Sequence, residues 1–161
     1  MDKNILLVAV RAALKAGARI MNVYTDPNSD FEIERKADNS PLTIADRKAH
    51  EIIAETLAST PYPVLSEEGK KFPYENRKDW KELWIVDPLD GTKEFIKRNG
   101  EFTVNIAYVK DGVPEAGVIY IPVKKELFIA DCTLGAYKLT DVVDIEDTVV
   151  FSLRVSICRD N

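Results

Sequence analysis

The stretch that decides the fold is WIVDPLDGTKEF, residues 84–95. Its apolar start, residues 84–86, is typical of the end of a buried strand, and Asp87 follows directly. A second acid, Asp90, comes three residues later, with Pro88 between the two. One interpretation is an ordinary turn, because Asp, Pro and Gly are common in turns. The other is a functional site, because a carboxylate at the end of a buried strand needs a cation or several hydrogen-bond donors.

Two other stretches place acids beside apolar segments. In LSEEG, Glu67 and Glu68 follow a short apolar strand pattern, and taken alone this stretch is best explained as a solvated turn. Asp46 comes three residues after Thr43, which fits a helix capping box. If the helix begins at Ser40 instead, Asp46 lies in its second turn, on an apolar face where an acid needs a partner. Both interpretations of Asp46 are open at this point.

The chemistry of these acids favours a hard cation. Oxygen donors without supporting His or Cys are typical of Mg²⁺ sites, and Mg²⁺ pairs held by carboxylates recur in phosphoryl transfer. The single histidine, His50, is interpreted as a surface or helix-packing residue. Lys36, at the end of a short strand pattern, looks by itself like an ordinary surface lysine. The backbone N–H groups of Gly91 and Thr92 would face a phosphate where the chain enters a helical turn.

The first part of the chain predicts two helices. Residues 3–24 are Ala-rich and apolar on most turns, which indicates a helix that packs closely on a flat surface. The alternating stretch FEIERK predicts a strand with Phe31 and Ile33 on one face. The second helix is expected to run to about residue 60, with Ser40 as its N-cap and Pro41 in its first turn.

The rest of the chain predicts a sheet. Residues 70–82 are charged and aperiodic, which favours an exposed, mobile loop. Short runs rich in Val, Ile and Tyr, divided by turn residues, then predict an antiparallel meander over residues 102–109, 113–122, 123–131 and 135–139. The predicted fold class is therefore α+β (layered α/β), with two N-terminal helices packed on a mostly antiparallel sheet.

Composition excludes some classes of partner. The 161-residue chain has a net charge of −5 and a pI of about 5.0, which argues against binding nucleic-acid polymers or anionic membranes. No apolar run is long enough for an integral membrane segment, and the N-terminal stretch is expected to be an amphipathic helix, not a signal peptide. We interpret Cys132 and Cys158 as structural thiols of a reduced chain and expect a cytoplasmic protein, with peripheral membrane association left open.

These motifs together resemble a known family. D-P-L-D-G-T after a Trp-led strand, with an upstream S-E-E and an upstream T-x-x-D, is similar to the inositol monophosphatase superfamily of Mg²⁺-dependent, lithium-sensitive phosphatases. The continuation K-E-F, together with PLTIAD and LSEEG, resembles the 3′(2′),5′-bisphosphate nucleotidases of the CysQ type. The resemblance implies removal of the 3′-phosphate from adenosine 3′,5′-bisphosphate, a by-product of sulfate assimilation, to give AMP. The alternatives are an inositol-phosphate or sugar-bisphosphate phosphatase and a non-catalytic fragment.

The resemblance also implies a role for each matching residue. Two or three Mg²⁺ ions would be held by Glu67, Asp87, the Leu89 carbonyl and Asp90. Asp46 and Thr92 would orient and deprotonate the attacking water. The substrate would contact Lys36, Glu67, Leu89, Asp90, Gly91 and Thr92, with Glu68 supporting the ligands.

The resemblance divides the chain into two parts. Residues 1–140 would form the metal-binding N-terminal phosphatase domain, and residues 141–161 a linker and the first strand of a C-terminal domain that is otherwise missing. The family's further metal-binding Asp, in a W-D-x-A-A stretch, has no counterpart in the sequence. We therefore expect little or no turnover from these residues alone. The alternating terminal stretch, residues 151–157, is expected to promote self-association as an unpaired edge.

Overall fold

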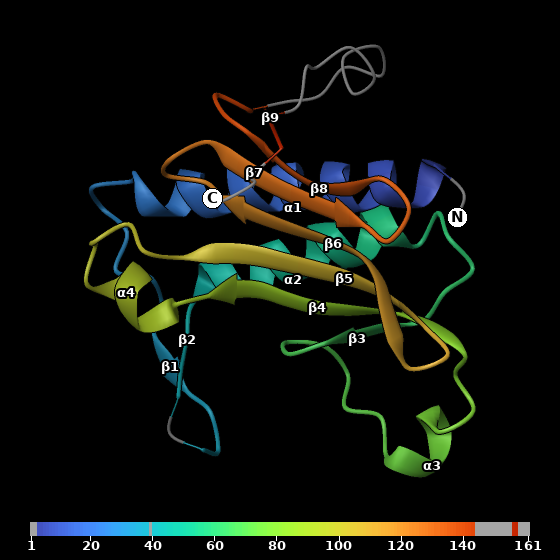
Figure 1. Cartoon of the computed structure of the whole chain (residues 1–161). Helices are drawn as coiled ribbons and strands as arrows, with labels where there is room; N and C mark the ends of the chain where they lie inside the picture. The colour runs from blue at the N-terminus through green and yellow to red at the C-terminus, as the bar shows by residue number, and fades with distance from the viewer. Residues whose placement is uncertain (1–2, 39, 144–155, 158–161) are drawn as a thin grey trace.

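The computed structural model describes residues 3–38, 40–143 and 156–157. Two helices, α1 (Lys3–Tyr24) and α2 (Ile44–Leu57), lie side by side against one face of a seven-stranded sheet (Figure 1). No described element covers the opposite face, which is turned to the viewer in Figure 1. This arrangement confirms the predicted α+β class with two N-terminal helices on the sheet.

The sheet runs β3-β4-β5-β6-β7-β8-β9, so its strands lie in chain order. Among the described strands of this sheet, only β3 and β4 pair in parallel, and every later neighbour is antiparallel, which confirms the predicted meander. The strands are β3 (Val64–Ser66), β4 (Glu82–Asp90), β5 (Thr103–Lys110), β6 (Val113–Ile121), β7 (Glu126–Asp131), β8 (Gly135–Leu139) and β9 (Ser156–Ile157).

Three short elements project from the sheet. The hairpin of β1 (Glu34–Arg35) and β2 (Pro41–Leu42) and the helix α3 (Tyr74–Arg77) both lie below the β3–β4 side of the sheet in Figure 1, the hairpin at the left and α3 at the right. Helix α4 (Thr92–Ile96) follows β4 directly.

Small residues let α1 approach the sheet closely. Gly17 faces Tyr120 of β6, and a Cβ atom at position 17 would lie 2.3 Å from the Tyr120 ring. The ring is fixed, because it is buried and its hydroxyl donates to the Val142 carbonyl at 2.9 Å. The Ala-rich pattern therefore encodes both the helix and its distance from the sheet.

The start of α2 differs from the sequence-based prediction. Thr43 is the N-cap, its hydroxyl accepts from the Asp46 N–H, and the Asp46 carboxylate accepts from the Thr43 N–H at 2.7 Å. The capping-box interpretation is thus confirmed, and the predicted start at Ser40 is wrong because Pro41 belongs to strand β2. The reciprocal cap satisfies two N–H groups that a start at Ser40 would leave without side-chain partners.

Two other local predictions were also wrong. Phe31 and Ile33 do not share a face, since Phe31 is buried with a φ of 65° and Ile33 is exposed. The left-handed turn at Phe31 directs its ring onto Phe95, 4.7 Å away, so local packing overrides the alternating pattern. The charged segment at residues 70–82 is mostly exposed as expected, but it contains α3 instead of being a plain loop.

The end of the chain is described only in part. Of the stretch predicted as a strand, 151–157, only Ser156–Ile157 is described, and it pairs with β8 through Tyr137↔Ile157 and Lys138↔Ser156. These two residues pair with β8 on one side and form the edge strand of the described sheet, and the rest of the stretch lies outside the described residues together with Cys158. Cys132 is exposed after β7, which contradicts a packing role for its thiol. Among the described helices, none has the length and apolarity to cross a bilayer.

Candidate active site

Glu67 and Asp87 lie close together because Glu67 follows β3 and Asp87 lies in β4, the parallel neighbour of β3. Ser66 pairs with Val86, and the Glu67 N–H extends this pairing by donating to the Val86 carbonyl at 3.0 Å. The carboxyl ends of parallel neighbours lie at the same edge of a sheet. Glu67 and Asp87, twenty residues apart in sequence, are therefore side by side.

A bulge in β4 brings Asp90 to the same place. Asp87 pairs with Asn105 and Asp90 with Thr103, so three steps along β4 match two along β5. In a regular strand, residues three apart point to opposite faces, and the extra residue of a bulge removes that alternation. Asp90 Oδ2 then accepts a hydrogen bond from the Asn105 side-chain amide at 3.1 Å.

The cluster carries more negative charge than its surroundings compensate. Burial, followed by the nearby Glu67 and Asp90 carboxylates, raises the pKa of Asp87 to about 7. A hydrogen bond from the Leu89 N–H favours the charged form but does not cancel these effects. The raised pKa indicates a position where a cation would be strongly stabilised.

One lysine from the β1–β2 hairpin engages this cluster. Lys36 Nζ lies 2.9 Å from Glu67 Oε1 and also contacts Glu68 Oε1. Burial disfavours the ammonium, yet the hydrogen bonds with Glu68 and Glu67 outweigh it and raise the pKa of Lys36. The pKa of Glu68 is raised, because burial outweighs the favourable contact with Lys36. Lys36 is therefore part of the acidic cluster and not an ordinary surface lysine.

The predicted catalytic pair, Asp46 and Thr92, is assembled next to the acidic cluster. Asp46 is only 1% exposed, and the hydroxyl of Thr92 donates to Asp46 Oδ1 at 3.0 Å. The same hydroxyl lies 3.2 Å from the Leu89 carbonyl oxygen, so one proton is shared between two acceptors. Burial raises the pKa of Asp46 even though hydrogen bonds from Thr43 and Thr92 oppose it. Asp46 also acts electrostatically on Glu68, which joins the pair to the acidic cluster.

Gly91 makes the turn from β4 into α4. Its φ is +94°, in the left-handed region that favours glycine. An added Cβ would lie 2.6 Å from the Glu101 carbonyl oxygen. Both the positive φ and this clash therefore disfavour a side chain at position 91. The turn places Thr92 as the first residue of α4, with its hydroxyl beside Asp46.

The donor atoms of this cluster suit a hard cation, because all of them are oxygens. Within the described ranges, however, no three carboxylate, imidazole or thiol groups form a ready-made metal cage. The raised pKa of Asp87 shows that the acids are nevertheless close to one another. The cluster therefore brings acids close together without forming a closed set of carboxylate ligands in the described residues. Its residues fit Mg²⁺ in chemistry, with Glu67 shared with Lys36.

Sequence reasoning missed the residues that support the acids from neighbouring elements. Asn105 holds Asp90, and the Thr103 hydroxyl donates to Asn105 Oδ1 at 3.0 Å. The only signal was two polar residues alternating with Val and Ile at the start of a predicted strand. His50 forms a hydrogen bond with the buried Ser66 hydroxyl at 2.9 Å, which confirms its packing role.

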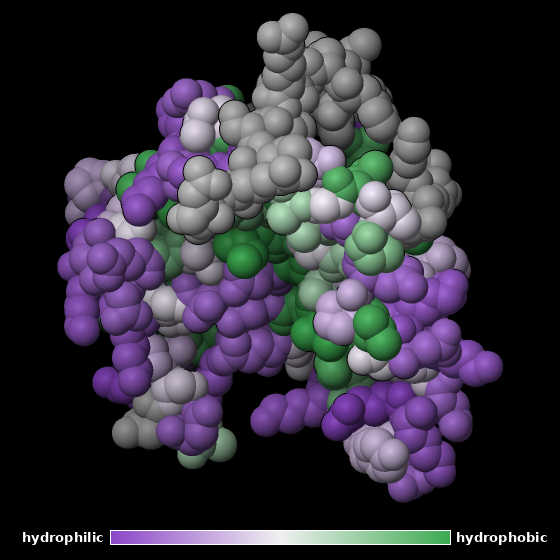
Figure 2. All heavy atoms as spheres, viewed as in Figure 1, coloured by the Kyte–Doolittle hydropathy of each residue, from purple (hydrophilic) through white to green (hydrophobic). Residues whose placement is uncertain are grey.

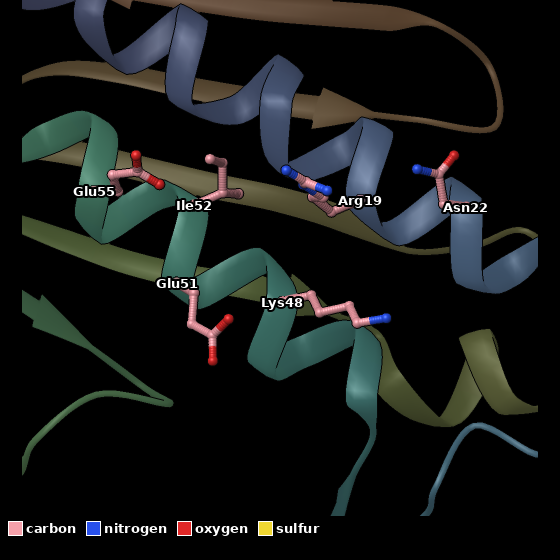
Figure 3. Close-up of a pocket in the computed structure, with 6 residues that line it drawn as sticks. All are labelled: Arg19, Asn22, Lys48, Glu51, Ile52 and Glu55. Carbon is pink, nitrogen blue, oxygen red and sulfur yellow. The ribbon is translucent and has the colours of Figure 1, made fainter.

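Two hollows differ in their relation to this cluster. One of about 450 Å³ runs along the uncovered face of the sheet and includes Asp87 and Asn105 at one end. The other, about 320 Å³, lies between α1 and α2 and is shown in Figure 3. Its six labelled residues are two cations, two acids, Asn22 and Ile52, and none of the predicted site residues lines it. Of the predicted site residues, Asp87 alone lines the hollow on the sheet face.

Comparison with known proteins identifies the family of this chain. The inositol monophosphatase family model matches residues 1–158, and the chain belongs to this family. Enzymes of the family are generally Mg²⁺-dependent. The chain is 54% identical to the 3′(2′),5′-bisphosphate nucleotidase CysQ of Salmonella typhimurium over 120 residues, covering 73% of this chain and 48% of that protein. The corresponding protein of Escherichia coli K12 is 52% identical over the same shares.

Solved structures give the same result for the fold. CysQ from Bacteroides thetaiotaomicron superposes with a TM-score of 0.82 at 62% identity, covering 91% of this chain and 53% of that one. The extragenic suppressor protein suhB from Bartonella henselae gives 0.76 at 34% identity, with 84% and 52% covered. The chain spans about half the length of the curated relatives it matches.

The role of Gly91 can be measured against a matched glycine. Gly112 also has a positive φ, of +79°, but an added Cβ there would meet nothing within 4 Å. Gly112→Ala should therefore lose only about 1 kcal/mol of unfolding free energy, the usual backbone cost. Gly91→Ala should lose a further 1–3 kcal/mol or so from the clash with the Glu101 carbonyl. Urea denaturation of both variants measures the difference, and equal losses would show that the turn relaxes freely.

Proposed function

We propose that this chain carries the metal-binding part of a Mg²⁺-dependent phosphatase that removes the 3′-phosphate of adenosine 3′,5′-bisphosphate. The observation that carries the proposal is the meeting of Glu67, Asp87 and Asp90, which the parallel β3–β4 register and the β4 bulge bring to the same strand ends. Glu67, Asp87, Asp90 and the Leu89 carbonyl would hold two or three ions. When bound, Mg²⁺ would supply Lewis-acid stabilisation of the phosphate oxygens.

The protein's own groups would handle the proton. Thr92 donates its hydroxyl hydrogen to Asp46, so the oxygen lone pairs of Thr92 are free to accept from a water molecule. The water would pass a proton to Thr92 Oγ1 as Thr92 passes its own to Asp46 Oδ1. The raised pKa of Asp46 suits a general base, because a more basic carboxylate accepts a proton more readily.

The first turn of α4 would hold the substrate phosphate. The Gly91 and Thr92 N–H groups lie where the chain leaves β4, beside the acidic cluster. Lys36, Glu67, Leu89 and Asp90 would complete the contacts around the phosphate. The sequence Lys93-Glu94 after this turn, and relatives named as 3′(2′),5′-bisphosphate nucleotidases, support a nucleotide substrate over inositol phosphates.

The uncovered sheet face supports the division of the fold at about residue 140. Ile85 and Ile119 are 44% and 46% exposed and line the 450 Å³ hollow that ends at Asp87. Figure 2 shows hydrophobic residues gathered on this face between hydrophilic margins. We infer that, in a protein of its relatives' length, the further residues pack on this face. They would close the hollow beside the metal site, and residues 141–161 would lead into them.

Metal binding should depend most on Asp87. Asp87→Asn removes the charge between Glu67 and Asp90 and should weaken Mg²⁺ binding by at least about tenfold, which is 1.4 kcal/mol. Asp111→Asn is the matched control, since it removes an acid from the distant β5–β6 turn, where Asn tolerates the positive φ. Calorimetric titration compares the two. Similar Mg²⁺ affinity in both variants would remove Asp87 from the site.

Substrate preference tests the proposed activity. In a protein of the relatives' length, kcat/KM for adenosine 3′,5′-bisphosphate should exceed that for inositol 1-phosphate, because that ratio measures discrimination between substrates. Phosphate release with both substrates at saturating Mg²⁺ is the measurement. A preference for inositol 1-phosphate would redirect the proposal to an inositol-phosphate phosphatase and leave family membership unchanged.

The uncovered face should also affect the 161-residue chain itself. We expect this chain to self-associate in solution, because a contiguous apolar face favours burial against another surface. Ile119→Lys should reduce the mass measured by light scattering, whereas Val113→Lys, at an exposed position outside the hollow, should not. A wild-type chain that stays monomeric at high concentration would contradict the inference.

A further inference from the structure

The contact between Lys36 and the acids occupies groups that the metal would need. Lys36 Nζ bridges Glu67 at 2.9 Å and Glu68. The Lys36 and Glu68 side chains are only 23% and 9% exposed, so solvent screens their contact less than an open surface pair, whereas the Glu67 side chain is 54% exposed. A carboxylate oxygen that accepts from an ammonium has less charge to offer a cation. In the structure, Lys36 therefore stands as the counter-ion of the acidic site.

The hairpin that carries Lys36 is built to hold it in place. The Lys36 N–H donates to the Ser40 carbonyl at 2.9 Å, which closes the hairpin. Asp38 Oδ1 accepts from the Ser40 N–H at 3.0 Å and from its hydroxyl at 2.6 Å, which orders the turn. The Lys36 ammonium thus reaches the acids from a backbone with a defined shape.

A separate ion pair ties the same hairpin to the body of the protein. Arg47 of α2 lies 2.9 Å from Glu34 and 3.6 Å from Glu32. This second contact does not involve the acidic cluster. A metal at the acidic cluster would therefore disturb the Lys36 attachment of the hairpin and leave the Arg47 attachment in place.

We propose that Lys36 is a built-in competitor of Mg²⁺: it docks the β1–β2 hairpin on Glu67 and Glu68, and metal binding displaces it and frees the hairpin end. The proposal rests on the proposed function, because it takes the acidic cluster as the Mg²⁺ site. A divalent ion carries twice the charge of the ammonium, so it takes over the shared carboxylate. The freed ammonium is then available to a substrate phosphate at the same site.

The expected change in Mg²⁺ affinity follows from the fraction of time that Lys36 occupies the acidic site. If Lys36 occupies the site for nine-tenths of the time, the apparent Mg²⁺ affinity is reduced about tenfold, in proportion to the free fraction. Lys36→Gln removes the competitor and should bind Mg²⁺ roughly three- to tenfold more tightly than wild type. The effect is opposite in sign to that of losing a metal ligand.

Two control variants separate competition from simpler causes. Lys93→Gln removes one positive charge from an exposed position in α4, close to the site, and controls for general electrostatics. Glu34→Gln weakens the Arg47 attachment of the same hairpin and controls for loosening alone. Neither residue is among the proposed metal ligands, and the readouts are Mg²⁺ affinity and hydrogen exchange, not substrate turnover.

The experiment combines titration of Mg²⁺ by calorimetry with amide hydrogen exchange of residues 32–42. In wild type, Mg²⁺ should speed exchange in the hairpin; in Lys36→Gln, exchange should be fast at the start and insensitive to Mg²⁺. Only Lys36→Gln should gain clearly in affinity. Equal affinity gains in Lys36→Gln and Lys93→Gln, or hairpin exchange that ignores Mg²⁺ in wild type, would overturn the role of Lys36. Absence of Mg²⁺ binding in all variants would overturn the metal site itself, and the competition with it.

Discussion

The parallel pairing of β3 with β4 is the constraint on which the site depends. It is the one parallel contact in the described sheet, and it aligns Ser66 with Val86 so that Glu67 and Asp87 emerge together. An antiparallel partner would have placed the corresponding acids at opposite edges of the sheet. The helix α2, which connects the hairpin to β3, packs on the same sheet and delivers Asp46 to that edge.

Keeping several acids together has an energetic cost that other parts of the molecule offset. Asn105 and the Leu89 N–H each supply a donor to one carboxylate of the group, and Lys36 supplies donors to both Glu67 and Glu68. These donors come from β5, from the bulge and from the hairpin, so the site is stable only when separate elements are docked. The remaining imbalance is concentrated at Asp87, which is where a divalent cation would stabilise the structure most.

The two faces of the sheet have different roles. The face under α1 and α2 holds the core, with Trp84, Val86 and Ile106 almost fully buried. Alternation along β4 places Ile85 and Asp87 on the other face, where the hollow begins. The acidic site therefore lies at the margin of an apolar surface, an arrangement that suits a ligand enclosed between this sheet and further residues.

The sequence by itself determined the family, the first helix, the meander and most of the residues that the fold brings together in the candidate site. The D-P-L-D-G-T motif, the Ala-rich stretch and the strand alternation are local patterns, and local patterns follow directly from backbone geometry. Only the tertiary structure decided that Thr43 caps α2, that Thr92 lies on Asp46, and that Asn105 supports Asp90. It also decided that Lys36 bridges Glu67 and Glu68, 31 and 32 residues away. Such contacts depend on strand register and on a bulge, and neither leaves a periodic signal in the sequence.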